Sequence, residues 1–449
     1  MFGDKMKRIK LSPYVLILLS FVILLLIGAI LLMLPISLQN GQFGNFLDSL
    51  FTATSALCVT GLVVNDVNTT YTIFGKIVIL ILIQLGGLGV LTFSSMVLLT
   101  ISSKMGYYTK KIVSEDINYN ILTEIPTFLK QVFLVVFLIE LIGATFLFFT
   151  FITKMPFLNA LGYSIFHAIS AFCNAGFALF ANNLEDFTGN FLINFVITSL
   201  IILGGIGFAS IIDIYNVILK KRRKVSASTH IAIYMTIFLV IIGAIFTFLL
   251  EFNNENTLAN LPLYKKILAS YFQSVTLRTA GFQTINLSYI TMPTILLYIA
   301  LMFVGASPGS TGGGIKTTTV GVLILGVINA VTGREDIEYR KRKISWSIFN
   351  KACAILVISL LYVSVMLFLM SIFDTEKGFL PLLFELISAF GTVGLSMGLT
   401  ASLSVPTKLI LIITMYIGRV GPLTIIYAIS RKRRKEGKYK YPEETVLIG

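Results

Sequence analysis

Long apolar runs separated by short polar connections dominate the chain. A helix needs roughly 20 apolar residues to cross the hydrocarbon core of a bilayer. Seven continuous runs reach that length, at 11–35, 72–101, 128–152, 191–219, 229–250, 350–373 and 407–430. An eighth, 291–331, is long enough but is interrupted by glycine and proline. The pattern therefore predicts an all-α membrane protein with eight transmembrane helices.

Four further apolar segments are too short to cross a membrane. They lie in alternate connections, at 46–57, 157–172, 262–277 and 379–390. We expect each to enter the membrane as a re-entrant pore helix and turn back, which requires backbone that is buried in protein or lines water. For any one segment taken alone, an amphipathic helix on the outer surface is the alternative.

The ends of these four segments share one motif. They read SALCVTGL (55–62), SAFCNAGF (170–177), VTLRTAGF (275–282) and SAFGTVGL (388–395). The aligned glycines, Gly61, Gly176, Gly281 and Gly394, are 115, 105 and 113 residues apart. A repeat of this kind divides the chain into four copies of helix, pore loop and helix. The predicted units are 1–101, 102–219, 220–331 and 332–430, followed by a cytoplasmic tail, 431–449.

Composition excludes a soluble protein. Hydrophobic residues make up 56% of the chain and charged residues 12%, about half the usual globular share of charge. The amino terminus, alternate connections and tail hold 25 of the 35 lysines and arginines. The positive-inside rule therefore predicts a multi-pass plasma-membrane protein with both termini in the cytoplasm. No polar segment is long enough to form a nucleic-acid-binding face, so we expect no nucleic-acid partner. Three cysteines and two histidines indicate neither a disulfide framework nor a histidine-based metal centre.

The aligned glycines point to ion conduction. A dehydrated cation is coordinated by carbonyl oxygens of an extended loop, and glycine adopts the backbone angles that turn successive carbonyls to one side. Four such loops, related by four-fold pseudo-symmetry, would surround one central ion pore. The predicted ion-binding residues are Val59, Thr60, Gly61, Asn174, Ala175, Gly176, Thr279, Ala280, Gly281, Thr392, Val393 and Gly394.

Together these features resemble the potassium-translocating subunits of the Ktr/Trk/HKT superfamily, across roughly 11–430. The chain looks closest to the membrane subunit of bacterial Ktr systems. The resemblance implies one selectivity-filter glycine per repeat, with K⁺ held at the filter carbonyls. Sodium-selective plant members carry serine at the first position, so Gly61 favours potassium. The third loop departs from the others, because Arg278 and Thr279 lead into it.

The interrupted run would measure about 60 Å as one helix, twice the membrane thickness. Its glycines and proline disfavour helix, and discontinuous helices mark ion sites in transporters. The resemblance implies a gate loop that lies across the pore just inside the filter. The predicted gate residues are Gly305, Ala306, Ser307, Pro308, Gly309, Ser310, Thr311, Gly312, Gly313, Gly314, Lys316 and Arg419. A phosphate-binding loop is excluded because Ile315 separates the glycines from Lys316. A flexible helix break is the remaining alternative.

Arg419 lies near the middle of the last predicted span. A charge at that depth costs about 2.5–3.5 kcal/mol, so the side chain should face protein or water. In a cation path a fixed positive charge would be a barrier, and the resemblance places it beside the gate loop. The structural alternative is an arginine satisfied by helix-end carbonyls.

The predicted function is channel-like K⁺ uptake without a cofactor, with Na⁺ as an allowed activator. The resemblance implies a homodimer in membrane lipid, on a separate cytoplasmic ring of nucleotide-binding regulatory subunits. A sodium-conducting protein is one alternative. An alternating-access transporter is another, although it would favour two inverted halves over four parallel repeats. An enzyme would need converging acid–base or nucleophilic groups, and the candidates Glu140, Asp213, His167 and Cys58 lie in different repeats or lack recurring partners.

Overall fold

The computed structural model describes residues 13–89, 125–220 and 224–421, and helices account for most of them. The predicted tail and the far ends of the runs 72–101 and 407–430 lie outside these residues. The longer helices are α1 (Pro13–Met33), α4 (Ile73–Leu88), α7 (Ile125–Phe151), α9 (Phe191–Ile206), α10 (Phe208–Ile218), α11 (Ala227–Glu251), α13 (Met292–Phe303), α14 (Thr317–Val331), α15 (Trp346–Phe373) and α17 (Val405–Val420). The short helices that precede the glycine motifs are α2 (Phe46–Leu57), α8 (Phe157–Phe172), α12 (Leu263–Thr276) and α16 (Phe379–Gly391). One further helical turn, α3 (Val67–Thr70), precedes α4.

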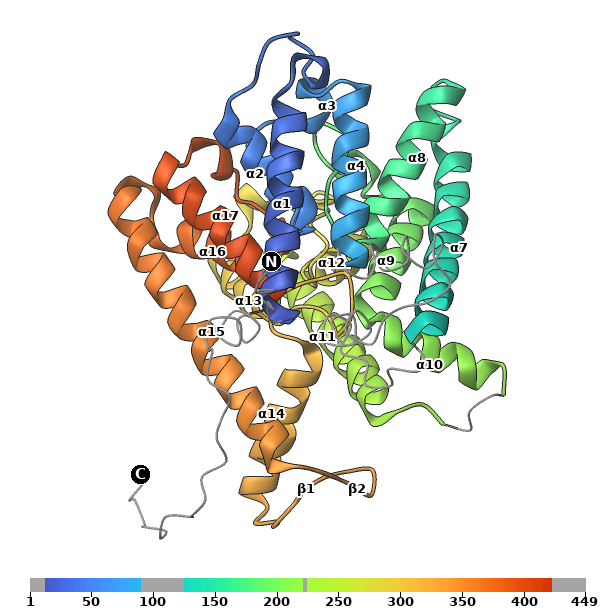
Figure 1. The fold of residues 1–449 in the computed structure, drawn as a ribbon, viewed down its shortest axis with the longest axis vertical. Coiled ribbons are helices and arrows are strands. Elements are labelled where there is room, and N and C mark those ends of the chain that lie inside the picture. The colour runs from blue at the N-terminus through green and yellow to red at the C-terminus, as the bar shows by residue number, and fades with distance from the viewer. Residues whose placement is uncertain (1–12, 90–124, 221–223, 422–449) are drawn as a thin grey trace, which may run out of the picture.

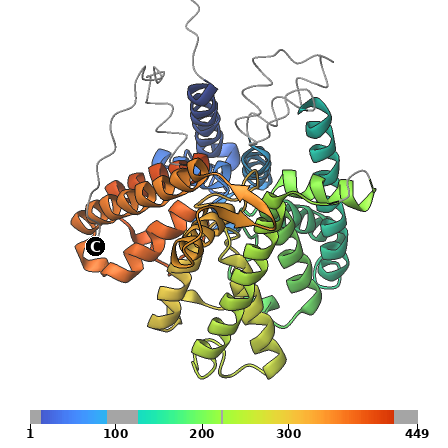
Figure 2. The ribbon, with the colours of Figure 1, turned by 90° about the horizontal axis from the view of Figure 1, so that it is seen from below.

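The helices are arranged in a circle (Figures 1 and 2). Each short helix packs against the long helix before it in sequence: α2 on α1, α8 on α7, α12 on α11 and α16 on α15. Each also packs against the helix that follows the preceding glycine motif: α8 on α4, α12 on α9 and α16 on α13. Contact between α17 and α2 closes the circle. The short helices are therefore brought together in the middle of the molecule.

Burial follows the same arrangement. Outward-facing apolar side chains on the long helices are exposed, for example Leu134 at 59% and Leu361 at 62%. The short helices are buried, and Phe172, Phe272 and Phe384 have no exposed surface. Apolar residues on both the outside and the inside are what a bilayer environment requires.

The number of membrane spans is only partly visible in the described residues. Within them, α7, α11 and α15 are long and apolar enough to span a membrane, and α9 with α10 forms a fourth span if the bent pair is counted as one. Several other apolar helices are shorter, with 10–17 residues each. The number of eight transmembrane helices therefore stays a prediction.

The run 191–219, predicted as one transmembrane span, forms two helices. The chain bends by 99° between α9 and α10. At the bend Gly207 has φ +99°, and a Cβ there would lie 2.5 Å from the carbonyl oxygen of Pro308. Only glycine adopts this conformation readily and leaves room for the neighbouring backbone.

The predicted break in the run 291–331 is present. Helix α13 ends at Phe303 and α14 begins at Thr317. The two sides of the intervening loop meet in a parallel bridge between Val304 and Ile315, so the break is a closed loop with defined ends.

Carboxylates at the ends of two long helices cap the helices that follow the glycine motifs. Glu251, the last residue of α11, accepts hydrogen bonds from the backbone N–H and the hydroxyl of Thr291, both at 2.8 Å. Asp374, directly after α15, accepts from the Ser404 hydroxyl at 2.8 Å. Thr291 and Ser404 are the N-cap residues of α13 and α17. Capping of this kind fixes where the second helix begins.

A small basic hairpin projects from one end of the molecule, below α14 in Figure 1. Strands β1 (Ile337–Tyr339) and β2 (Arg342–Ile344) pair antiparallel. Arg340, in the turn, lies 3.0 Å from the Tyr234 hydroxyl and 3.1 Å from His230 of α11. The hairpin is thus held against the start of a long helix.

Candidate functional site

The four short helices end at the glycine motifs. They stop at Leu57, Phe172, Thr276 and Gly391, three to five residues before the aligned glycines. The C-terminus of a helix carries a partial negative charge of about half an elementary charge. Four such ends converging on one place favour a cation there.

Backbone conformation repeats through the four loops. The residue two positions before each glycine has a left-handed φ: 56° for Val59, 58° for Asn174, 68° for Thr279 and 50° for Thr392. The aligned glycines also have positive φ, between 69° and 96°. Left-handed φ is uncommon for residues with side chains and rare for β-branched ones. The same uncommon geometry in all four loops indicates one shared structural requirement.

Hydrogen bonds to the short helices hold the loops in this shape. The backbone N–H groups of Thr60, Ala175 and Val393 donate to the carbonyls of Ser55, Ser170 and Ser388, at 2.7–2.8 Å. In the third loop the equivalent N–H, of Ala280, donates instead to Thr276 at 3.0 Å. The third loop, which departs in sequence, thus keeps the conformation of the others with a shifted hydrogen bond.

The four glycines form a closed ring. A Cβ on Gly61 would lie 2.5 Å from the carbonyl oxygen of Ala175, one on Gly176 2.8 Å from that of Ala280, and one on Gly281 2.6 Å from that of Val393. A Cβ on Gly394 would collide with the carbonyl oxygen of Thr60. Each glycine therefore faces the carbonyl that precedes the next glycine, and the order 61, 176, 281, 394 returns to its start.

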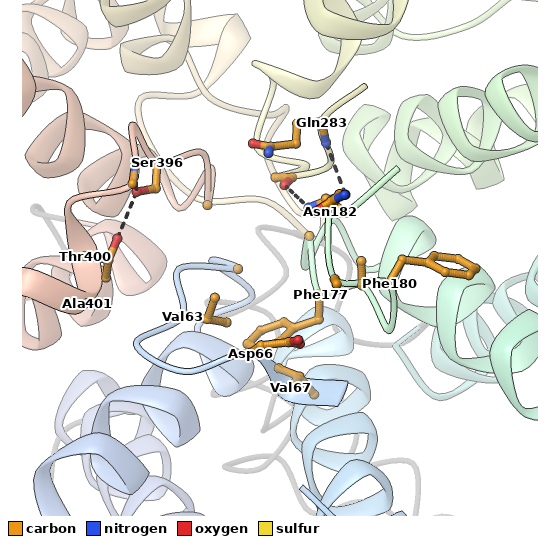
Figure 3. Close-up of a pocket in the computed structure, with 18 of the residues that line it drawn as sticks. Val63, Asp66, Val67, Phe177, Phe180, Asn182, Gln283, Ser396, Thr400 and Ala401 are labelled. Carbon is orange, nitrogen blue, oxygen red and sulfur yellow. Dashed lines mark hydrogen bonds between the residues drawn. The ribbon is translucent and has the colours of Figure 1, made fainter. Parts of the chain in front are cut away.

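A cavity of about 420 Å³ lies on one side of the ring and is lined by all four glycines. Figure 3 shows the loops around it, with Val63, Phe177, Gln283 and Ser396 on different segments. Its lining includes two carboxylates, Asp66 and Glu185, and no lysine or arginine of the described residues. The cavity is thus open to a cation and carries negative charge.

Burial raises the pKa of the Glu185 carboxyl, and the hydrogen bond from the Gln283 amide, at 2.9 Å, acts in the opposite direction. The neighbouring Asp186 adds to the increase. The charge at this place on the cavity wall is therefore lost at a higher pH than for an ordinary glutamate.

The predicted gate loop lies on the other side of the ring. The N–H of Gly313 donates to the Thr392 hydroxyl at 2.8 Å, and Gly312 packs against the Thr279 hydroxyl. Gly314 donates to the Gly418 carbonyl at 3.2 Å, and Ser307 to the Gly205 carbonyl at 2.9 Å. The loop is therefore hydrogen-bonded to the end of α9 and to the segments around Thr392 and Gly418, and it packs against Thr279.

Two cations accompany this loop. The guanidinium of Arg419 donates to the carbonyls of Thr311 and Gly86, and to that of Gly87 at 3.2 Å. Lys316 donates from Nζ to the Gly312 carbonyl at 2.7 Å. The carbonyl partners of Arg419 come from the loop and from the end of α4.

The structure brings the predicted site residues together on both sides of one ring. The predicted ion-binding residues form the ring, and the predicted gate residues form the loop beside it with their two cations. The main-chain carbonyls of Thr60, Ala175, Ala280 and Val393 lie against the ring glycines. Within the described residues, no cluster of three or more His, Cys, Asp or Glu side chains is present.

Sequence reasoning missed three polar contacts around the ring. His167, considered above only as a candidate for enzyme chemistry, accepts a hydrogen bond from the N–H of Leu179 at 3.2 Å. Glu385 was not singled out, yet it accepts from the hydroxyls of Ser396 and Thr400. The Asn183 amide lies 3.4 Å from the Gly281 carbonyl. His167 and Glu385 each stand nine residues before the glycine of their motif. A comparison of the four repeats at that position would have identified both, whereas no feature of the motif points to Asn183.

Comparison with known proteins agrees with the resemblance drawn from the motifs. The model of the TrkH family, described as a cation transport protein, matches residues 11–437. Ktr system potassium uptake protein B of Bacillus subtilis is 39% identical over 445 residues, which are 99% of this chain and 98% of the relative. Potassium/sodium uptake protein NtpJ of Enterococcus hirae is 34% identical over 99% of both chains.

Among solved structures, the potassium transporter TrkH of Vibrio parahaemolyticus has the same fold. Its TM-score is 0.73 at 18% identity, and the match covers 96% of this chain and 87% of that one. Since the family model spans nearly the whole chain and includes the ring, the loop and Arg419, the chain belongs to the TrkH family of cation transport proteins.

Proposed function

We propose that this chain is the potassium-translocating membrane subunit of a Ktr-type uptake system and that it conducts K⁺ through the ring of four glycine loops. The observation that carries the proposal is the closed ring, in which each glycine faces the carbonyl of the next loop. Carbonyl oxygens replace the hydration shell of a passing K⁺. The four helix C-termini and the acidic cavity add negative potential along the same path.

The order of features along this path supports a functional direction. The cavity with Asp66 and Glu185 would be the outer entrance, and the loop Gly305–Gly314 would lie just inside the filter as a gate. This orientation follows the positive-inside pattern of the sequence. The basic hairpin would then face the cytoplasm, where it could meet a separate regulatory subunit.

Substitution of the ring glycines tests the proposal. Each of Gly61→Ser, Gly176→Ser, Gly281→Ser and Gly394→Ser should lower the K⁺-over-Na⁺ uptake ratio by about tenfold or more, because a side chain displaces a neighbouring carbonyl. Uptake of K⁺, Rb⁺ and Na⁺ would be measured in a potassium-uptake-deficient strain and in proteoliposomes. Gly162→Ser is the matched control, since nothing lies within 4 Å of a Cβ there. Wild-type uptake and ion preference in all four variants would refute the proposal.

The gate is tested at Arg419, whose guanidinium joins the loop to α4. Arg419→Gln should raise the maximal uptake rate several-fold by releasing the loop. Arg419→Lys keeps the positive charge but loses the planar set of guanidinium donors. If the contacts with the carbonyls hold the gate closed, its maximal uptake rate should rise as much as that of Arg419→Gln. A lysine variant with wild-type rates would show that charge alone forms the barrier.

Sodium conduction is the second candidate, and the name of the NtpJ relative, a potassium/sodium uptake protein, favours including it. The same ion-flux measurement separates the two, because a sodium-conducting protein would take up Na⁺ at least as fast as K⁺. Dependence of K⁺ uptake on added Na⁺ would instead indicate activation.

We further propose, from the resemblance drawn in the sequence analysis, that the subunit acts as a membrane homodimer on a ring of nucleotide-binding regulatory subunits. The name of the Bacillus subtilis relative, a protein of a Ktr system, supports only the presence of further components. Co-purification with such a subunit, with and without Lys341→Glu and Arg342→Glu in the hairpin, would test the contact. Unchanged co-purification of the charge-reversed variants would exclude the hairpin from it.

A further inference from the structure

Two polar side chains inside the short helices have no part in the function proposed above. His167 lies in α8 and Glu385 in α16, and both are completely buried. Each stands nine residues before the glycine of its own motif. Buried polar groups of this kind are retained where they satisfy specific partners.

His167 is hydrogen-bonded at both ring nitrogens. Its Nδ1 lies 2.7 Å from the Tyr163 carbonyl, which can only accept, so Nδ1 carries the proton. Nε2 is then the acceptor for the backbone N–H of Leu179, at 3.2 Å. Leu179 lies three residues beyond Gly176, on the segment that leaves the ring toward the cavity. The imidazole thus holds that segment against the short helix.

Glu385 does the same in the fourth repeat with a different side chain. Its two carboxylate oxygens accept hydrogen bonds from the hydroxyls of Ser396 and Thr400, the second at 2.9 Å. Ser396 in turn accepts from the N–H of Gly398 at 2.9 Å. Ser396 lies two residues beyond Gly394 and lines the cavity. The carboxylate therefore organises the whole turn that follows the glycine.

In the described parts of the other two repeats, no hydrogen bond is found from the equivalent residue to the few residues directly after the glycine. Thr52 donates to the carbonyl of Asp48 in its own helix, at 2.9 Å, and also contacts Tyr71, ten residues beyond Gly61. Phe272 has no polar group. Since the ring order is 61, 176, 281, 394, the repeats that contain His167 and Glu385 lie opposite each other across the axis.

We propose that His167 and Glu385 are positioning residues for ion discrimination, which hold two opposite loops of the ring at the spacing that K⁺ requires. The inference rests on the proposed function of the ring. Discrimination between K⁺ and the smaller Na⁺ depends on how far the carbonyls can approach the ion. A loop released from its short helix can follow the smaller ion inward, whereas a held loop cannot.

The test compares variants that remove or keep the acceptor. His167→Phe preserves an aromatic ring among Phe151 and Phe180 but leaves the Leu179 N–H without a partner, and Glu385→Leu removes the carboxylate. Both should lower the K⁺-over-Na⁺ uptake ratio about tenfold or more, because one buried donor loses its acceptor in His167→Phe and two do in Glu385→Leu. His167→Gln and Glu385→Gln keep an acceptor oxygen and should stay within about threefold of the wild-type ratio. Thr52→Val is the matched control at the same position and should leave the ratio unchanged.

The readout is the ion ratio in proteoliposomes at equal amounts of folded protein, together with the KM for K⁺ and the maximal rate. Wild-type ratios in folded His167→Phe and Glu385→Leu would overturn the inference. If either variant does not fold, two milder variants replace it: Ser396→Ala and Thr400→Val each remove a single hydroxyl. Both should lower the K⁺-over-Na⁺ uptake ratio about threefold. Unchanged ratios in these two variants would also overturn the inference. Failure of the proposed function itself is distinguishable, because wild-type protein would then show no K⁺ flux or the glycine variants would keep the wild-type ratio.

Discussion

Left-handed backbone at residues with side chains is the most specific local feature of the ring. Val59, Thr279 and Thr392 are β-branched, and this conformation costs such residues about 1–3 kcal/mol unless their surroundings enforce it. Here the short helices and the following loop supply that enforcement through hydrogen bonds. The aligned glycines were visible in the sequence because they are the residue type that such loops favour. The residues two positions earlier were not, because valine and threonine ordinarily indicate extended strand.

Thr392 joins the ring to the gate loop, and its loss should therefore affect flux more than folding. Thr392→Val keeps the shape but removes the acceptor for the Gly313 N–H. We expect maximal K⁺ uptake by the isolated subunit to rise about two- to fivefold, as one buried hydrogen bond worth roughly 1 kcal/mol is lost from the loop. Initial rates in proteoliposomes would measure this. Thr392→Ser, which retains the hydroxyl, should behave as wild type, and an equal rise in both variants would contradict the role of the hydrogen bond.

At the scale of helices, the short segments were the most predictable part of the fold. The predicted ranges 46–57 and 157–172 are those of α2 and α8, and 379–390 differs from α16 by one residue. Their apolar runs begin after proline, asparagine or glycine and end at the motif, so both boundaries are marked. The bend between α9 and α10 was missed, because Gly207 follows Gly204 and Gly205, and such glycines also occur where helices pack closely. Only the contact of Gly207 with Pro308, which is distant in sequence, distinguishes a glycine at a bend from a glycine at a helix-packing contact.

Gly207 should tolerate no side chain. In Gly207→Ala the new Cβ would meet the Pro308 carbonyl, in a positive-φ backbone conformation that costs residues with a side chain about 1–3 kcal/mol. We expect the thermal unfolding midpoint in detergent to fall by several degrees, with a higher basal K⁺ flux because Pro308 belongs to the gate loop. Gly162→Ala, in a short helix with open space around it, should leave both quantities unchanged. An unaltered midpoint in Gly207→Ala would show that the bend can relax.

At the scale of the whole molecule, charge is distributed along one path. Negative charge lines the cavity on one side of the ring, and Arg419 and Lys316 lie on the other. A count of charges in the sequence predicts which side of the membrane the basic loops face, and that side stays a prediction. The sequence did not indicate the acidic cavity, because Asp66 and Glu185 are separated by more than a hundred residues and meet only through folding.

The acidic cavity should raise the local concentration of cations. The double variant Asp66→Asn with Glu185→Gln should raise the KM for K⁺ about two- to tenfold at ~10 mM ionic strength, with the maximal rate unchanged, and the effect should disappear near 0.5 M salt. Asp66→Asn keeps the oxygen that caps Asn68, so the change is mainly one of charge. Glu338→Gln, in strand β1 of the hairpin and outside the cavity lining, is the control. An effect that is independent of salt would exclude electrostatic attraction.

Acidity should act through Glu185. Because burial raises the pKa of this carboxyl, lowering the external pH neutralises it before an ordinary glutamate. The KM for K⁺ should therefore rise as pH falls through that raised pKa, and recover as pH increases. Glu185→Gln should remove this part of the pH dependence. Initial uptake rates between pH 4 and 8 would show it, and an identical pH profile in the variant would assign the dependence to another group.

The ring is assembled from four loops of one polypeptide, and this has a consequence for how such proteins diversify. In a channel made of four identical subunits, one codon change alters all four sides of the conduction pathway at once. Here one codon change alters a single side and leaves three intact. Natural selection can therefore adjust ion preference in small steps, and relatives can differ at one wall of the pathway while the other three stay the same.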